Sequence, residues 1–174
     1  MKLLIIQTSP PNTASTFLVN AIYGLIPELF DKNIFFYDWD HNFDCHFENI
    51  ISFKTHITNI DEFINKYKEN YKLVFICSER SKRNYLIDKK YKTYNNVVVF
   101  DFDELNETPD NTLIQIVNNM YDKLTKVLVD VELDKTKCIE RIKLMNNKYD
   151  EIKNESFDYV DLFFHIHGSH RNRK

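Results

Sequence analysis

Unbroken apolar runs alternate along the chain with segments whose apolar residues recur at helical spacing. Residues 3–7 form an apolar run that ends in polar residues, as a buried parallel strand does. Residues 8–15 are polar and rich in turn formers, and residues 16–26 then repeat apolar side chains at helical spacing until Pro27. The N-terminal segment therefore predicts a strand, a loop and a helix, which is the start of a βαβ unit.

The rest of the chain continues this alternation. Further strands are expected at residues 34–37, 50–54, 73–78 and 97–101. Further helices are expected at residues 60–70, 112–128, 135–153 and 157–165. We find no repeat, low-complexity stretch or linker. The pattern predicts one domain over residues 1–174, with a three-layer αβα fold, a mostly parallel central sheet of about four to five strands, a helical C-terminal half and a basic tail at 165–174.

Glycine is scarce enough to exclude several kinds of nucleotide and catalytic loop. The 174 residues include only 2 glycines, Gly24 and Gly168, which stand far apart. A dinucleotide fingerprint needs three clustered glycines, whereas a Walker A loop or a nucleophile elbow needs two. A nucleotide site in this chain must therefore use a different kind of loop. Gly24 falls within a predicted helix, where we expect close packing.

The net charge and the cysteines indicate which partners and which cellular compartment to expect. The formal net charge of −3 argues against general nucleic-acid binding, which usually leaves a basic footprint. Three scattered cysteines, Cys45, Cys77 and Cys138, form no C-x-x-C pair and suit free thiols in a reducing compartment. The first apolar run is too short for a signal peptide or a membrane span. We therefore expect a cytoplasmic protein that binds neither nucleic acid nor membrane.

The loop after the first strand carries three hydroxyl side chains near the start of the next helix, those of Thr13, Ser15 and Thr16. In open α/β sheets, ligands bind beyond the carboxyl ends of the strands. A helix that starts there presents unbonded N–H groups and the positive end of its dipole, which suit an anion such as a phosphate. The alternative is structural, since Thr13 or Ser15 can simply cap the helix.

Two further strand ends carry candidate chemistry. Lys54, Thr55 and His56 come at the end of a predicted strand, and a histidine there can deprotonate a hydroxyl near neutral pH. Arg80 and Ser81 follow the next predicted strand, and the arginine fork suits a phosphate. The alternatives are a loop histidine with local partners and a surface arginine in a charged run.

Metal sites are weaker hypotheses. Asp101 and Asp103 are paired acids that could indicate a metal site. Their segment is instead predicted to form a strand, a turn and a helix capped by Asp110 or Asn111. The tail histidines lack accompanying carboxylates or thiols. The cluster of His41, Cys45 and His46 is zinc-like only superficially; it is read as loop chemistry or as lining of an acceptor pocket.

The segment from Pro11 to Leu18, P-N-T-A-S-T-F-L, resembles the sulfonate-donor loop of sulfotransferases, which runs approximately P-[KR]-[ST]-G-[ST]-T-[WF]-L. Asn12 stands where that family has a basic residue, and Ala14 stands where it has glycine. Alanine is the least damaging replacement where φ is negative. The Lys54-Thr55-His56 triplet is similar to the K-T-H of the cytosolic sulfotransferases. Residues 97–120 follow the family's order of a strand, an acidic turn, a proline and a helix.

This resemblance implies a P-loop-like topology and a sulfotransferase that needs no metal. The donor would be 3′-phosphoadenosine 5′-phosphosulfate, and the product 3′-phosphoadenosine 5′-phosphate. The acceptor would be a hydroxyl, or an amine, of a small molecule or a glycan. His56 would act as general base, and Lys54 would supply positive charge. The donor-binding residues implied are Asn12, Thr13, Ala14, Ser15 and Thr16 at the 5′-phosphosulfate, Phe17 near the adenine, and Arg80, Ser81, Gly168 and Arg171 at the 3′-phosphate.

Two alternatives stay open. Because Asn12 removes the family's cation, the chain can instead be a sulfotransferase-like fold that has lost transfer activity and binds a nucleotide, a phosphorylated ligand or a protein. A nucleotide or phosphoryl-transfer enzyme of the wider P-loop class is the third interpretation, although the Gly-Lys-[Ser/Thr] signature is missing.

Overall fold

A five-stranded parallel sheet is the centre of the fold in the computed structural model, which describes residues 2–37, 49–105, 113–152, 160–161, 163–164 and 166–167. The strand order is β2-β3-β1-β4-β5. The strands are β1 (Lys2–Thr8), β2 (Phe35–Phe36), β3 (Ile50–Thr55), β4 (Tyr71–Glu79) and β5 (Val97–Asp101). The predicted parallel α/β sheet is confirmed.

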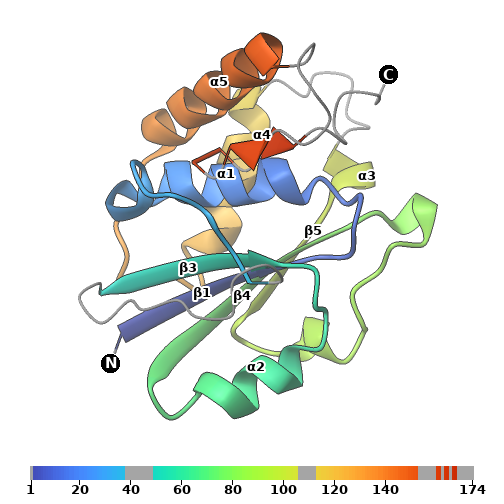
Figure 1. Cartoon of the computed structure of the whole chain (residues 1–174). Helices are drawn as coiled ribbons and strands as arrows, with labels where there is room; N and C mark the ends of the chain where they lie inside the picture. The colour runs from blue at the N-terminus through green and yellow to red at the C-terminus, as the bar shows by residue number, and fades with distance from the viewer. Residues whose placement is uncertain are drawn as a thin grey trace.

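Helices cover both faces of the sheet and make the fold three-layered (Figure 1). Helix α1 (Ser15–Leu25) packs on one face together with α4 (Leu113–Leu124) and α5 (Lys135–Ile152), and α2 (Ile60–Tyr67) packs on the other. One-turn helix α3 (Phe102–Leu105) follows β5 directly. Three short 3-10 turns complete the helical elements of the described residues, at Pro27–Leu29, Ser81–Arg83 and Tyr91–Thr93.

The central strand β1 is apolar from Leu3 to Ile6 because it is buried on both faces. Leu3 and Ile5 belong to the hydrophobic cluster beneath α1, whereas Leu4 and Ile6 belong to the cluster above α2. This two-sided burial explains why an unbroken apolar run, and not an alternating one, marked the strand in the sequence.

Helices α1 and α5 approach closely at Gly24. A Cβ atom added to Gly24 would lie 2.6 Å from Cα of Cys138 and 3.1 Å from Cβ of Arg141. The Cys138 thiol also donates to the carbonyl of Ala21 at 3.4 Å. The expectation of close packing at Gly24 is therefore confirmed.

The helix expected over residues 157–165 is wrong in the part of that segment that the structure describes. Residues 163–164 form a turn between two short antiparallel strands, β6 (Val160–Asp161) and β7 (Ile166–His167). Asp161 Oδ1 accepts hydrogen bonds from the backbone N–H of Phe163 and Phe164, at 3.0 and 3.3 Å. An aspartate that binds its own following amides competes with helix formation and favours a turn.

Arg141 fastens this C-terminal turn to the helical layer. Its side chain is fully buried and donates to the backbone carbonyls of Phe163 and Phe30. The guanidinium also lies 4.4 Å from the ring centroid of Phe163 and 5.2 Å from that of Tyr23. Burial lowers the pKa of Arg141 to about 10, so the arginine remains charged at neutral pH.

The carboxyl ends of the parallel strands meet at one edge of the sheet, where β1 and β3 are direct neighbours. The chain leaves β1 toward α1 on one face and leaves β3 toward α2 on the other (Figure 1). Adjacent strands whose connections diverge in this way leave a crevice in which α/β proteins bind ligands.

Candidate functional site

The loop between β1 and α1 has a backbone conformation that favours glycine, although it contains none. Asn12 and Ala14 have φ angles of 68° and 62°. Ala14 is the residue that precedes α1, and no side chain caps the helix there. The capping role for Thr13 or Ser15 is therefore wrong. Alanine was expected to replace the family's glycine with little damage if φ were negative, but φ at Ala14 is positive. A left-handed conformation costs an alanine about 1–2 kcal/mol.

A backbone of this conformation suits the binding of an anion. Left-handed Ala14 is followed by helical Ser15, and such a change of hand directs successive N–H groups into a concavity that suits an anion. The first bond of α1 runs from Leu18 N to the carbonyl of Ala14, so the amides before Leu18 lie outside the helical ladder. The dipole of α1 adds positive potential at the same point. The arrangement is suited to a phosphate or a phosphosulfate.

Beneath the loop lies a cluster of fully buried polar side chains from Gln7, Ser9, Thr13 and Ser78. The Ser78 hydroxyl donates to Ser9 Oγ at 2.7 Å and lies 2.9 Å from Thr13 Oγ1. Ser9 Oγ also accepts from Ser78 N at 2.9 Å and from Gln7 Nε2 at 2.6 Å. The Thr13 hydroxyl donates to the carbonyl of Pro10 at 2.7 Å. The side chain of Thr13 therefore supports the loop from the buried side and is not exposed to solvent.

Sequence reasoning missed Gln7, Ser9 and Ser78. The signal that was available is register: β1 and β4 are parallel neighbours, and Thr8 lies opposite Cys77. The residues just after that pair are Ser9 and Ser78, so two hydroxyls fall side by side where two buried strands end.

His56 lies directly beside this loop. Its Nδ1 is 2.8 Å from the carbonyl oxygen of Ser9, and its ring meets that of Phe36 edge-on at 5.4 Å. A carbonyl oxygen only accepts hydrogen bonds, so Nδ1 carries the proton. In the neutral ring, Nε2 then holds the lone pair, which is the tautomer that a base acting through Nε2 requires.

Lys54 is buried in β3 with 1% of its surface exposed. It lies opposite Gln7 in the register of β1 and β3, and its Nζ is 5.5 Å from the ring centroid of Phe36. Side chains alternate along a strand, so Lys54 and Gln7 occupy the α1 face together with Ile5 and Ile50. The Lys54 side chain thus lies on the sheet face that α1 covers.

Arg80 follows β4 and turns toward α3. Its Nη1 lies 3.8 Å from Asp103 Oδ1, and its buried Nε has no hydrogen-bond partner among the described residues. Phe17, in the first turn of α1, packs edge-on against Phe102 of α3 at 5.7 Å. Through the neighbours Phe102 and Asp103, α3 brings the first turn of α1 and Arg80 into one region. The orphaned N–H of Arg80 suits a phosphate oxygen.

Ser81 and Asp101 form the other side of this turn. Ser81 is exposed, and its N–H donates to Asp101 Oδ1 at 3.4 Å. Burial raises the pKa of Asp101, but hydrogen bonds from the Ser81 hydroxyl and from three backbone amides outweigh it and hold that pKa below its ordinary value. Asp101 is therefore ionised at neutral pH.

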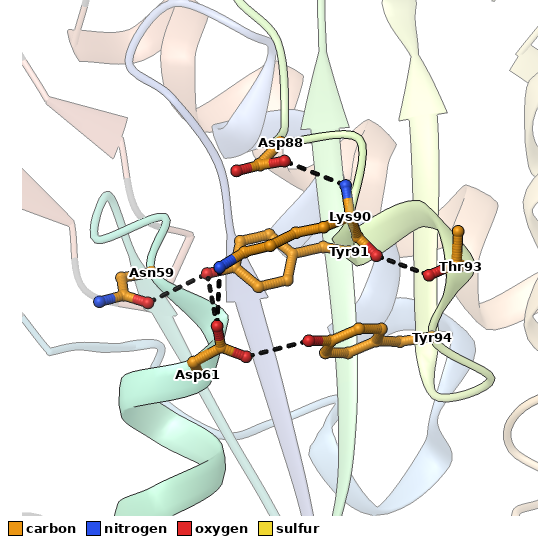
Figure 2. A network of polar contacts seen from close by, with 7 residues as sticks. All are labelled: Asn59, Asp61, Asp88, Lys90, Tyr91, Thr93 and Tyr94. Carbon is orange, nitrogen blue, oxygen red and sulfur yellow. Dashed lines mark hydrogen bonds and ion pairs between the residues drawn. The ribbon is translucent and has the colours of Figure 1, made fainter.

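The segment that follows Arg80 is anchored to α2 by a polar network (Figure 2). Asp61 accepts from Lys90 at 2.8 Å, from Tyr94 at 3.1 Å and from Tyr91 at 3.4 Å. Tyr91 also donates to Asn59 at 3.0 Å. The hydrogen bond between Lys90 and Asp61 lowers the pKa of the Asp61 carboxyl and raises the pKa of the Lys90 ammonium. These contacts tie residues 90–94 to the start of the helix that follows His56.

A separate cavity of about 290 Å³ lies along β5 and does not include the predicted site residues. Its charged lining comprises three carboxylates, those of Glu79, Asp101 and Glu104, and two lysines, Lys92 and Lys123. Lys92 is already bound to Glu79 at 2.5 Å. An excess of carboxylates disfavours a phosphate, so this cavity is a poor candidate for a phosphorylated ligand.

Several candidates fall outside the described residues. They are Gly168, Arg171, the tail histidines His165 and His170, the cluster of His41, Cys45 and His46, and the proposed cap residues Asp110 and Asn111. Within the part of the chain that is described, no group of three or more His, Cys, Asp or Glu side chains gathers closely enough to hold a metal ion.

Comparisons with models of known protein families, with curated proteins and with solved structures found no match to this chain. Over the described ranges, no helix combines the length and the apolar character needed to cross a bilayer.

Proposed function

We propose that this protein is a sulfotransferase that moves a sulfonate group from 3′-phosphoadenosine 5′-phosphosulfate to a hydroxyl or amine acceptor. One observation carries the proposal: the amide-presenting loop at the start of α1 lies in hydrogen-bond contact with the ring of His56. An anion site beside a correctly protonated base is the pairing that transfer to a hydroxyl requires.

The residues around the loop fit the two ends of such a donor. The amides of residues 14–16 and the dipole of α1 suit the 5′-phosphosulfate. Arg80 suits the 3′-phosphate, since its buried Nε lacks a partner within the described residues and its only ion pair there is a long 3.8 Å contact with Asp103. Phe17, beside α3, is available to the adenine. Gly168 and Arg171 are proposed to complete the 3′-phosphate site, as the family resemblance implies.

His56 would remove the proton from the acceptor. When bound, the donor supplies an activated sulfonate whose bond to phosphate breaks as the acceptor oxygen bonds to sulfur. Nε2 of His56 takes the acceptor proton, and the Ser9 carbonyl stabilises the resulting imidazolium through Nδ1–H. Lys54 adds positive charge on the same sheet face. Catalysis of this kind depends mainly on positioning and electrostatics.

Asn12 supports a second candidate, a protein that binds a nucleotide or another phosphorylated ligand without transferring a group. It stands where the resembled family has a basic residue, and its φ of 68° suits asparagine better than lysine or arginine. The neutral amide donates hydrogen bonds but adds no charge at the bridging oxygen.

A turnover assay distinguishes the two candidates. The wild-type protein is incubated with the sulfonate donor and a panel of phenols, alcohols, amines and glycans, and formation of 3′-phosphoadenosine 5′-phosphate is followed. We expect turnover with at least one acceptor, and we expect His56→Gln to reduce kcat by about 100-fold or more. Activity that survives His56→Gln unchanged would remove His56 from the role of base.

Arg80→Met and Arg83→Met form a matched pair, because both remove an arginine from the same segment but Arg83 is exposed. We expect Arg80→Met to raise the donor KM about tenfold, at the cost typical of a lost charged hydrogen bond, and Arg83→Met to behave as wild type. Donor binding without turnover on every acceptor, not restored by Asn12→Lys, would favour the binding protein. Buried free thiols at Cys77 and Cys138 fit a cytosolic setting for either candidate.

A further inference from the structure

The cluster of buried hydroxyls beneath the β1–α1 loop has a consequence for ligand binding. We propose that Ser78, at the end of β4, is a positioning residue that holds this loop in its anion-binding conformation through Ser9 and Thr13. The inference rests on the proposed function only in naming the ligand. The mechanical part, that a side chain of β4 fixes the loop, stands on the geometry alone.

The loop needs such a support because its backbone is strained. Thr13 lies between the two left-handed residues Asn12 and Ala14, and neither is glycine. Left-handed non-glycine residues persist where the surrounding structure over-determines them. No side chain caps α1 at Ala14, so a side-chain cap does not hold the loop in this conformation.

Ser78 provides this support from a different element. It lies 65 residues from Thr13 and 69 from Ser9 along the chain, yet its Oγ is within 2.9 Å of both hydroxyl oxygens. Its backbone N–H also donates to Ser9 Oγ at 2.9 Å. These three residues are fully buried, so water does not compete for the contacts. The hydroxyl of Ser78 therefore ties both ends of the loop to the rigid centre of the sheet.

The same cluster reaches the proposed base. The carbonyl of Ser9 accepts from His56 Nδ1, and the N–H of Ser9 donates to the carbonyl of Thr55 at 3.3 Å. A displacement of Ser9 would therefore move the loop and the imidazole together. Ser78 touches neither a ligand nor the base, and its effect on both would pass through Ser9 and Thr13.

The chain offers a matched control in Ser52. It is a buried serine on β3, and its Oγ has no hydrogen-bond partner among the described residues. Ser52→Ala and Ser78→Ala thus delete the same buried atom from the two strands that flank β1, but only the second deletion removes contacts to the loop. Thr13→Val removes the other end of the same contact, together with the hydrogen bond to the carbonyl of Pro10, while keeping the shape of the side chain.

The test combines calorimetry with 3′-phosphoadenosine 5′-phosphate and amide hydrogen exchange of residues 10–18. We expect Ser78→Ala to weaken binding about tenfold, as the loss of a buried hydrogen bond does, and to speed exchange in the loop. Ser52→Ala should match wild type in both measurements. Ser78→Ala combined with Thr13→Val should lose less than the sum of the two single variants, because they share the contact between Ser78 Oγ and Thr13 Oγ1. Each single variant also loses a contact of its own, to Ser9 Oγ for Ser78 and to the carbonyl of Pro10 for Thr13.

Three outcomes are informative. Wild-type exchange and affinity in Ser78→Ala would overturn the inference, and so would equal losses in Ser52→Ala. If the wild-type protein fails to bind the ligand, the proposed function fails, while loop exchange still decides whether Ser78 holds the loop.

Discussion

Exchange of Ala14 for glycine tests the conformation on which the candidate site depends. Ala14 has a φ of 62°, which costs an alanine about 1–2 kcal/mol relative to glycine. Relief of this cost would stabilise the variant, but glycine also increases the conformational entropy of the unfolded chain, which destabilises the folded protein by about 0.4–1 kcal/mol. Loss of the half-buried methyl group costs a further few tenths of a kcal/mol, since a fully buried methyl group contributes about 0.8 kcal/mol. We expect a net stabilisation of about 0.5 kcal/mol.

Ala21→Gly is the matched control, because the same substitution falls in the middle of α1 at a fully buried position. It loses about 1 kcal/mol of helix propensity and about 0.8 kcal/mol of burial. We therefore expect Ala21→Gly to destabilise the protein by about 2 kcal/mol. The free energies of unfolding of the two variants should differ by about 2.5 kcal/mol, which corresponds to roughly 5–10 °C in Tm for a chain of this length.

Urea and thermal unfolding of both variants measure this difference directly. Since glycine preserves the left-handed conformation, Ala14→Gly should also retain affinity for the donor product. If Ala14→Gly destabilises the protein as much as Ala21→Gly does, the residue is not left-handed, and the argument for converging amides fails with it.

Three further predictions concern packing and ionisation. Gly24→Ala gains about 1 kcal/mol of helix propensity but places a methyl group 2.6 Å from Cα of Cys138, and the overpacking costs about 1–3 kcal/mol. We therefore expect urea unfolding to show a lower free energy of unfolding for this variant. Unchanged stability would contradict the close contact between α1 and α5. Asp101→Asn should destabilise the protein at neutral pH, because the pKa of Asp101 is lower in the folded protein than in the unfolded chain. The stabilisation by Asp101 is present above the unfolded pKa and is lost as pH falls through the folded pKa. A stability difference between the variant and the wild type that persists in acid would refute this. Burial raises the pKa of the Cys77 thiol and raises that of Cys138 to about 12. Iodoacetamide at about pH 8 should therefore modify neither of these two in the native protein and both in denaturant, and labelling at Cys77 or Cys138 in the native protein would contradict their burial.

The sheet was predictable from the sequence because its strands are buried on both faces. Every predicted strand has a counterpart, although the run at residues 34–37 shortens to Phe35–Phe36 at the edge of the sheet. Of the two residues that pair in this edge strand, Phe36 is buried and Phe35 is exposed. The expected helix at 157–165 failed because local periodicity does not register the bonds from Asp161 to its following amides.

The candidate site was only half visible in the sequence. The loop after β1, His56 and Arg80 could be predicted, since each follows a recognisable strand. The inward direction of Thr13 and the part played by Ser78 could not, because they depend on a contact between residues 65 positions apart. The positive φ of Ala14 was hidden as well, since only a glycine would have marked it.

Isothermal calorimetry with 3′-phosphoadenosine 5′-phosphate and with ATP tests the central claim most directly. An anion loop beside His56, with Arg80 available for a second phosphate, predicts micromolar binding of 3′-phosphoadenosine 5′-phosphate and weaker binding of ATP. Tighter binding of ATP, or no binding of 3′-phosphoadenosine 5′-phosphate, would contradict the assignment of this site to a sulfonate donor.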